Sequence, residues 1–265
     1  EKFGFRVSFT ASGVLQRKAG KMLRRATTTL AVAALMTLVS ATSWAQLSAY
    51  SQDFEAMNQA DPAALSSDGW LVFGNVFDAG GGYIGGYGVF GAPNNPAAPA
   101  FCLVAAGQGG VPQGAQQIVV FNDYNNPEHL NNPTWIIESN VFQEQTVDAA
   151  DVGNTWDFTF DAKRGDLAAP STALAFFKTL DPNNGYATTN FITVDMTSIP
   201  TTWGTYSLSI FIDGSLAGQL LQFGFLNTAS GYSPSGVVYD NVNFAIQGTV
   251  AVEETTWSAT KNLYR

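Results

Sequence analysis

The sequence has 265 residues, of which 46% are hydrophobic and 12% charged, and its formal net charge is −9. Seven of the twelve basic residues but only one of the twenty-one acidic residues precede Gln46, so the chain from Gln46 onward carries a formal charge of −15. A surface that acidic repels phosphate backbones and anionic lipids, which argues against nucleic acid and membrane surfaces as partners. Neutral glycans are compatible with this charge.

The N-terminal region has the pattern of a secretory signal peptide. A short positive segment ending at Arg25 precedes an apolar run of about ten residues, Leu30–Val39, which is too short to span a bilayer. Small residues at Ser43 and Ala45 predict cleavage after Ala45. We therefore expect a protein that is secreted or displayed at the cell surface, without membrane insertion after cleavage. The alternative to a signal peptide is a buried N-terminal helix. Residues 1–21 precede Met22, the first methionine, and are expected to lie outside the fold.

Short apolar or alternating runs recur between Gln46 and Gly248, separated by Gly, Pro, Asn, Asp and Ser. This pattern predicts an all-β, two-sheet antiparallel sandwich of the jelly-roll type, in one domain over residues 46–248, followed by a linker and short tail over residues 249–265. The expected strands are Ser51–Met57, Trp70–Phe77, Phe101–Ala106, Gln116–Phe121, Trp135–Gln143, Thr155–Ala162, Ala173–Thr179, Phe191–Met196, Thr205–Phe211, Gln219–Leu226 and Gly236–Phe244.

Cys102 is the single cysteine, so the chain forms no intrachain disulfide and must derive its stability from a core or a bound ion. The cysteine lies in an apolar run and is expected to be a buried small hydrophobe. Two segments, Ala79–Gly88 and Asn122–Pro133, read as loops by their Gly, Asn and Pro content. Such loops are either functional or plain connectors.

Asp240 is the most unusual residue of the expected strands. Alternation along the last strand predicts that its side chain shares the core face with Val238, Val242 and Phe244. A buried carboxylate needs a partner, and the first strand carries Asp53 and Glu55. If the first and last strands are neighbours, these acids converge, and Ca²⁺ would neutralise them with oxygen ligands. The single His and lone Cys argue against zinc, and hydrogen bonding of Asp240 to loop amides at a sheet edge is the alternative.

Segments in the same order resemble the jelly-roll carbohydrate-binding modules that accompany secreted glycosidases, specifically the xylan- and glucan-binding group. The matching segments are Asp53–Met57, Asp68–Trp70, Trp156–Asp166, Thr201–Ile210, Leu220–Leu226 and Val237–Phe244. The resemblance implies a galactose-binding-domain-like sandwich, a polysaccharide or glycan partner, and a structural calcium at the positions of Glu55 and Asp240. The two loops match no motif of that group.

Sugar recognition requires flat aromatic faces and groups that both donate and accept hydrogen bonds. The candidate ligand-binding residues are Tyr83, Tyr87, Tyr124, Asn125, Asn126, Trp135, Tyr186 and Tyr232, with Gln143 nearby. Trp70, Trp156 and Trp203 lie in or beside expected strands and are more typical of a core.

No catalytic motif stands out. A Ser-His-Asp or Cys-His site would have to use His129, the single histidine, and the sequence contains no GxSxG, HExxH or phosphate-loop pattern. We therefore expect a non-catalytic protein, with a polysaccharide-active hydrolase or lyase as the enzymatic alternative. The alternative from a different class is an extracellular structural or adhesion protein that self-associates through its sheet edges or its tail.

Overall fold

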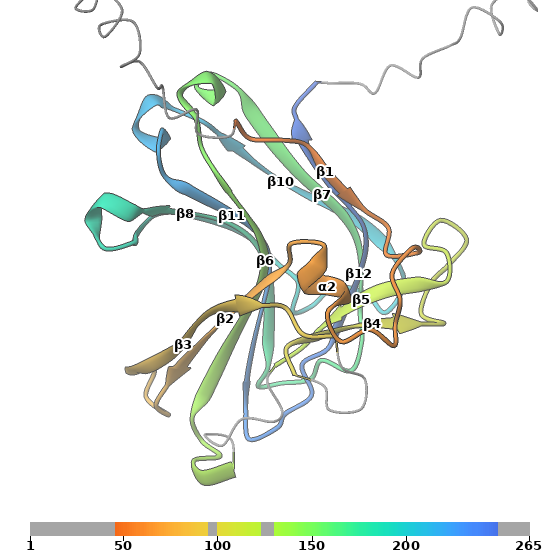
Figure 1. Cartoon of the computed structure of the whole chain (residues 1–265). Helices are drawn as coiled ribbons and strands as arrows, with labels where there is room; N and C mark the ends of the chain where they lie inside the picture. Colours follow the sequence, from red (N-terminus) through yellow and green to blue (C-terminus); the bar gives the residue numbers. More distant parts are fainter. Residues whose placement is uncertain (1–45, 95–99, 123–129, 249–265) are drawn as a thin grey trace, which may run out of the picture. The chain divides into compact units, whose positions relative to one another are not determined.

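The computed structural model describes residues 46–94, 100–122 and 130–248, which form two antiparallel sheets packed face to face (Figure 1). Sheet A contains, in spatial order, β10 (Gly204–Phe211), β7 (Thr155–Arg164), β12 (Val237–Ile246), β5 (Gln116–Val120) and β4 (Cys102–Ala106), with β1 (Tyr50–Gln52) also paired to β12. Sheet B contains β3 (Tyr83–Gly91), β2 (Leu71–Phe77), β6 (Ile136–Thr146), β11 (Leu220–Ser230), β8 (Thr172–Asp181) and β9 (Ala187–Asp195).

Short helices occur only in connections within the described part of the chain: α2 (Ala64–Ser67), η1 (Ala149–Asp151), η2 (Pro182–Asn184) and η3 (Gly214–Leu216). None of these helices has the length and apolar character needed to span a membrane. The two-sheet β-sandwich expected from the sequence is confirmed, and each of the eleven expected strands has a counterpart.

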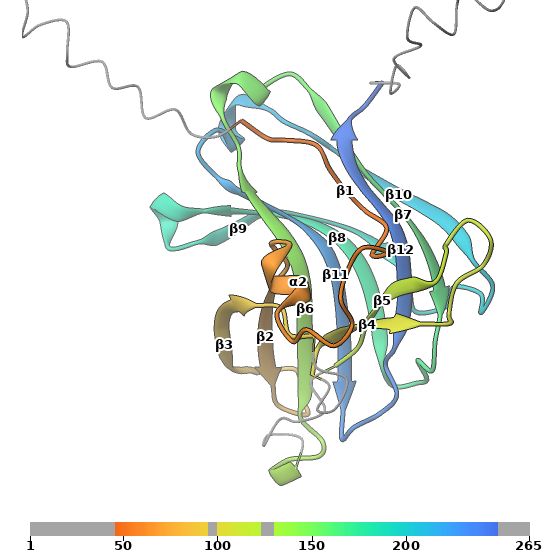
Figure 2. The ribbon, with the colours of Figure 1, turned by 45° about the vertical axis from the view of Figure 1, so that its right-hand side comes forward.

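The first and last strands are neighbours, which is the condition on which the expected approach of Glu55 to Asp240 depends. Tyr50 pairs with Phe244 and Gln52 with Val242, and Figure 2 shows β1 running beside β12. Alternating apolar residues direct one face of each sheet inward. Aromatic rings fill the space between the sheets: the rings of Phe225 and Tyr239 stack with centroids 3.6 Å apart, and those of Phe223 and Phe244 at 4.2 Å.

Two expectations about elements were wrong. The glycine-rich segment from Ala79 was expected to be a loop, but β3 begins at Tyr83. Glycine lowers strand propensity, yet β3 accommodates extra residues as bulges against β2, and Gly88 has a φ of 78° that suits a bulge. Trp203, expected in the core, is half-buried instead, with the ammonium of Lys163 5.2 Å from its ring centroid.

Sheet B has a second, smaller hydrophobic cluster away from the main core, formed by Phe142, Phe176 and Leu226. Gly224 pairs with Phe142 on one side and Phe176 on the other. A Cβ at Gly224 would lie 2.7 Å from Cα of Phe142 and would overlap the carbonyl oxygen of Val141. The missing side chain therefore leaves room for the two flanking rings and lowers the surface of the sheet between them. Figure 1 shows β3 and the β8–β9 hairpin extending away from sheet A at the two ends of sheet B.

Candidate functional site

A pair of carboxylates lies on the outer face of sheet A. Asp240 on β12 pairs directly with Asp161 on β7. Farther along the same strands Phe244 pairs with Phe158, a core residue three positions from Asp161, so Asp161 and Asp240 face away from the core. The expectation that Asp240 shares a face with Phe244 was therefore wrong. A register shift between Asp240 and Asn243, with Asn241 at a φ of 46°, reverses the alternation.

Asp240 is nevertheless fully buried. Its Oδ1 accepts a hydrogen bond of 2.6 Å from the backbone N–H of Asn241, whereas its Oδ2 is buried without a hydrogen-bond partner among the described residues. The pKa of Asp240 is raised to about 7, mainly by burial and to a smaller extent by the charges of Glu55 and Asp161, while the hydrogen bond from the backbone of Asn241 opposes the shift.

Glu55 approaches the same region from the segment after β1. Its Oε1 accepts hydrogen bonds of 2.7 Å from the backbone N–H groups of both Ala115 and Gln116. A Cβ at Gly114 would lie 2.5 Å from this oxygen, so glycine is required where the carboxylate sits. Asp53 has a local role, because its Oδ1 accepts a hydrogen bond of 3.1 Å from the backbone N–H of Glu55. It also borders a hollow beside the Asn241 bulge.

These oxygens fit a calcium ion only with help from backbone and water. No group of three His, Cys, Asp or Glu side chains in the described parts of the chain encloses a metal position. Asp161 is already satisfied: its Oδ1 accepts from Thr205 and its Oδ2 from Gln113 and Asn241, and these hydrogen bonds lower its pKa despite burial. The unpartnered Oδ2 of Asp240 and the carboxylate of Glu55 are the donor atoms that a hard cation would use.

A groove of about 590 Å³ crosses the outer face of sheet B from β3 to β9. Its apolar part includes the rings of Phe73 and Phe142 and the exposed ring of Tyr186. Polar side chains from three adjacent strands line the rest: Asn140 and Glu144 from β6, Gln222 from β11 and Lys178 from β8. The groove therefore combines aromatic surface with amide, carboxylate and ammonium groups.

The polar side chains of the groove are connected by hydrogen bonds. Lys178 donates to Asn140 Oδ1 at 3.0 Å, and Asn140 Nδ2 donates to Glu138 Oε1 at 3.1 Å. Asn75 Nδ2 also donates to Glu138 Oε1, at 2.8 Å, and Gln222 donates to Glu144 Oε2 at 2.8 Å. This network holds side chains of β2, β6, β8 and β11 in defined positions. Sequence reasoning missed all six residues, although Glu138, Asn140 and Glu144 lie on the same face of β6.

The candidate ligand residues from the sequence do not form one cluster. Tyr186 lines the groove. Tyr83 is 62% exposed, with its ring centroid 5.8 Å from that of Phe77, whereas Tyr87 is half-buried against the core with its ring beside Phe101. Tyr124, Asn125, Asn126 and His129 lie outside the described residues.

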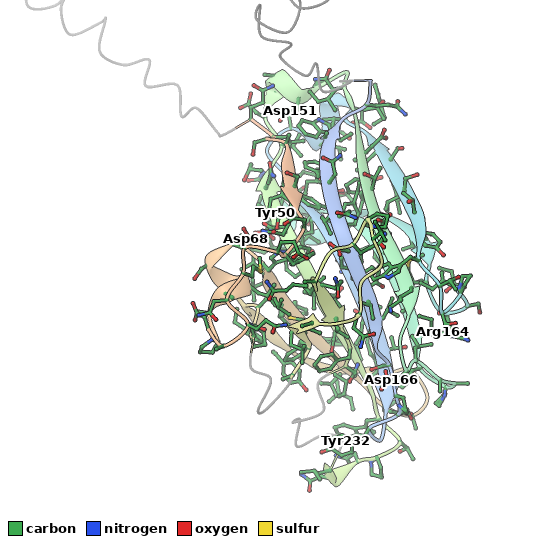
Figure 3. The ribbon with its side chains drawn as sticks, turned by 90° about the vertical axis from the view of Figure 1, so that its right-hand side faces the viewer. Tyr50, Asp68, Asp151, Arg164, Asp166 and Tyr232 are labelled. Atoms are coloured by element: carbon green, nitrogen blue, oxygen red, sulfur yellow. The ribbon has the colours of Figure 1, made fainter. Side chains whose placement is uncertain are left out.

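Three further residues lie apart from the groove lining. Trp135 is half-buried just before β6. Gln143 is buried and donates a hydrogen bond of 3.0 Å to the carbonyl oxygen of Asp68. Tyr232 lies at the end of the sandwich opposite Asp151 (Figure 3). The same view shows Tyr50 and Asp68 together, joined by a hydrogen bond of 2.5 Å.

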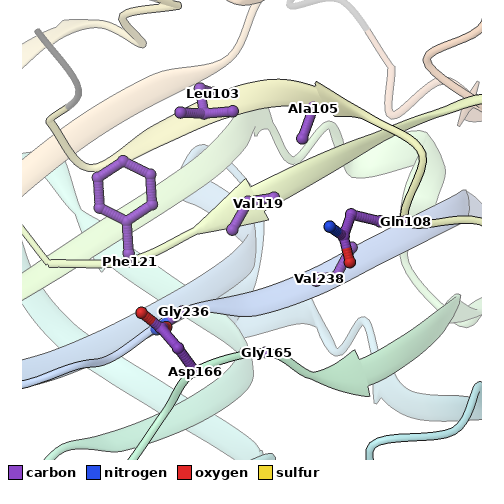
Figure 4. Close-up of a pocket in the computed structure, with 9 residues that line it drawn as sticks. All are labelled: Leu103, Ala105, Gln108, Val119, Phe121, Gly165, Asp166, Gly236 and Val238. Atoms are coloured by element: carbon purple, nitrogen blue, oxygen red, sulfur yellow. The ribbon is translucent and has the colours of Figure 1, made fainter. Parts of the chain in front are cut away.

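A second hollow, of about 400 Å³, lies on the outer face of sheet A (Figure 4). Leu103, Val119 and Val238 form its floor, and Asp166 lies at its rim. Asp166 Oδ1 already accepts the backbone N–H of Gly236 at 2.8 Å. The hollow offers few hydrogen-bonding groups, so it suits a polyhydroxylated ligand less well than the groove does.

Cys102 is fully buried, and its thiol donates to the carbonyl oxygen of Pro93 at 3.4 Å. Burial raises the pKa of this thiol well above its usual value, which disfavours the thiolate that a nucleophile requires. The expectation of a buried small hydrophobe is confirmed.

No protein-family model and no curated protein matches this sequence. In its fold the chain resembles carbohydrate-binding modules. One similar structure is the xylan-binding domain of module family 22, with 15% identity and a TM-score of 0.39 over 79% of this chain and 99% of that one. Another is a Clostridium thermocellum xylanase containing a family 22 module, complexed with xylohexaose, with 12% identity and a TM-score of 0.40 over 75% of this chain.

A tailspike domain of bacteriophage CBA120, described as enzymatically active, is also similar, with 15% identity and a TM-score of 0.38 over 55% of this chain. This chain spans 17% of the tailspike domain and 28% of the xylanase. The function is therefore argued below from the residues of this chain.

Proposed function

We propose that this protein is a secreted, non-catalytic glycan-binding protein that holds a polysaccharide chain in the sheet B groove. The observation that carries the proposal is that Asn75, Asn140 and Lys178, linked by hydrogen bonds through Glu138, line one groove beside aromatic rings. Aromatic faces pack against the C–H surfaces of pyranose rings, and amides and carboxylates bond to hydroxyl groups. Side chains already held in place lose little conformational entropy on binding.

Affinity electrophoresis of the purified protein through gels containing neutral and acidic soluble polysaccharides tests this function. Asn140→Ala removes the central amide of the groove, and Asn243→Ala, on the exposed surface of sheet A, is the matched control. We expect at least one polysaccharide to retard the wild type and the Asn243→Ala variant but not Asn140→Ala. If the wild-type protein is folded and no polysaccharide retards it, the proposed function is wrong.

We also propose that a structural calcium ion links the start and end of the domain. Asp240 Oδ2 and the Glu55 carboxylate would hold it, completed by backbone and water oxygens, and Asp53 would support the turn that presents Glu55. The support is the buried, unpartnered oxygen of Asp240 next to two other negative charges. When bound, the ion would supply the positive charge that this carboxylate lacks and would connect the segments flanking β1 and β12.

Self-association is the second candidate, favoured by one feature of the fold. The edge strand β3 contains no charged residue and no proline, and Ile84, Val89 and Phe90 are exposed on it. Its two bulges work against strand pairing with another copy. Size-exclusion chromatography with light scattering distinguishes the two proposed functions. A monomer that binds glycan contradicts self-association. A defined oligomer that dissociates in the Val89→Lys variant supports it.

A further inference from the structure

Among the residues that the structure describes, Lys178 is the only basic residue that lines the sheet B groove. Its ammonium nitrogen lies 5.0 Å from the ring centroid of Phe176 and 5.2 Å from that of Phe191. The same nitrogen donates a hydrogen bond of 3.0 Å to Asn140 Oδ1. Burial lowers the pKa of Lys178, while the nearby charge of Glu138 opposes that shift. The positive charge is thus already surrounded by two aromatic faces, an amide oxygen and a carboxylate.

The hydrogen bond from Lys178 determines how the neighbouring side chains are oriented. A lysine ammonium only donates, so the oxygen of the Asn140 amide must face it and the NH₂ group must face away. That NH₂ group then donates to Glu138 Oε1 and to the carbonyl oxygen of Phe73, at 3.1 and 3.2 Å. Asn75 donates to the same Glu138 oxygen. Within the described residues, Glu138 Oε2 and Asn75 Oδ1 receive no hydrogen bond, which leaves two acceptors for the hydroxyl groups of a ligand.

We propose that Lys178 is the positioning residue of the groove: it orients Asn140, and through Asn140 the carboxylate of Glu138, so that Glu138 Oε2 and Asn75 Oδ1 remain as acceptors for sugar hydroxyls. The ligand that this arrangement suits is an uncharged glycan. This inference rests on the glycan-binding function proposed above. Two carboxylates, Glu138 and Glu144, outnumber the single ammonium in and beside the groove. A uronic acid or a sulfate group would meet a net negative charge there, whereas hydroxyl groups would meet oriented acceptors.

The chain provides a matched control for Lys178. Lys163 on β7 also lies over an aromatic ring, at 5.2 Å from the centroid of Trp203, and also donates to a carbonyl oxygen, that of Gln108. It belongs to sheet A, away from the groove. Lys178→Met and Lys163→Met therefore make the same chemical change, but only the first removes a donor to the groove network.

Isothermal titration of the purified full-length variants with soluble neutral xylan, a neutral mixed-linkage β-glucan and polygalacturonate tests the inference. We expect the wild type to bind a neutral polymer more tightly than polygalacturonate. Lys178→Met should weaken neutral binding by about tenfold or more, the usual effect of losing a charged hydrogen bond. Lys163→Met should stay within about twofold of the wild type, and Lys178→Arg, which still donates to Asn140, should retain most of the affinity.

A readout without ligand separates positioning from general destabilisation. The side-chain amide NMR signal of Asn140 should shift in Lys178→Met, but not in Lys163→Met, while the melting temperature stays within a few degrees of wild type. Two results overturn the inference. One is an affinity of Lys178→Met for the neutral polymers that equals that of the wild type. The other is a wild type that binds polygalacturonate more tightly than the neutral polymers, with this binding lost in Lys178→Met. If Lys178→Met does not fold, Asn140→Ala must weaken neutral binding while Lys178 stays in place, or the inference fails. A wild type that binds none of the polymers overturns the glycan-binding function as well.

Discussion

Asp240 and Asp161 occupy directly opposite positions on β12 and β7, yet their environments are opposite in kind. Asp161 accepts hydrogen bonds from Thr205, Gln113 and Asn241, and its pKa is lowered. Asp240 keeps one oxygen buried without a partner, and its pKa is raised to about 7. The cost of placing two carboxylates side by side therefore falls on Asp240.

The first prediction concerns pH in the presence of a chelator. A carboxyl group whose pKa rises from about 4 in the unfolded chain to about 7 in the fold favours folding when protonated. This contribution is fully present below about pH 4 and is lost as the pH rises through about 7. The free energy of unfolding of the wild type in EDTA should therefore decrease relative to that of Asp240→Asn between pH 4.5 and pH 8. Parallel curves for the two proteins in urea unfolding would contradict this.

The second prediction concerns calcium. At pH 8 the ionised Asp240 has no compensating charge, so added Ca²⁺ should raise the melting temperature by several degrees and excess EDTA should reverse it. Asp240→Asn should lose this response. Asp157→Asn on β7, where the carboxylate accepts a hydrogen bond from Ser209, should keep it. Differential scanning calorimetry measures the shift. A wild-type melting temperature that is the same in Ca²⁺ and in EDTA would contradict the proposed calcium site.

The third prediction concerns Tyr186 and Tyr83, both exposed tyrosines at positions proposed from the sequence. Tyr186 lines the groove and Tyr83 does not. Tyr186→Ala should weaken glycan binding by about fivefold or more, since an aromatic platform contributes on the order of 1 kcal/mol. Tyr83→Ala should leave the affinity unchanged. Titration calorimetry with the tightest-binding polysaccharide provides the comparison, and equal losses in both variants would place the ligand elsewhere.

The fourth prediction concerns Gly224, which lies between Phe142 and Phe176 in sheet B. Gly224→Ala would force a Cβ against the carbonyl oxygen of Val141 and within 2.7 Å of Phe142 Cα, both of which belong to backbone that cannot rotate away. We expect a loss of about 1–3 kcal/mol of unfolding free energy in urea. Gly85→Ala on β3, where a Cβ would meet nothing within 4 Å, is the control. Two variants of equal stability would show that the β6–β11 contact is looser than described.

The fifth prediction concerns the aromatic core. Phe244 stacks on Phe223 at 4.2 Å and on Trp156 at 4.5 Å between ring centroids, and it is fully buried. Phe244→Ala should therefore cost about 3–5 kcal/mol of unfolding free energy. Phe211→Ala, at a side chain that is 58% exposed, should cost less than about 1 kcal/mol. Denaturant titration of the two variants measures the difference directly.

Strand positions were predictable because alternation and turn residues carry local information. The segment from Tyr83 to Gly91 was missed because its glycines resemble a loop, and only pairing with β2 makes it a strand. Asp240 was assigned to the wrong face because one bulge reverses the alternation, and bulges leave no clear mark in a single sequence.

The groove depends on strand neighbours rather than on local pattern. Asn140, Gln222 and Lys178 are adjacent only because β6, β11 and β8 lie side by side, an order that no segment of the sequence encodes by itself. The first and last strands of sandwiches are often neighbours, and on that condition the approach of Glu55 to Asp240 was expected from the sequence.

Side-chain amide NMR during a titration with the tightest-binding oligosaccharide tests the central claim most directly. If the sugar occupies the sheet B groove, the NH₂ signals of Asn75, Asn140 and Gln222 shift together with increasing ligand, and the signal of Gln108, beside the sheet A hollow, stays in place. Shifts at Gln108 with unmoved groove amides would show that the protein takes its ligand on the other sheet.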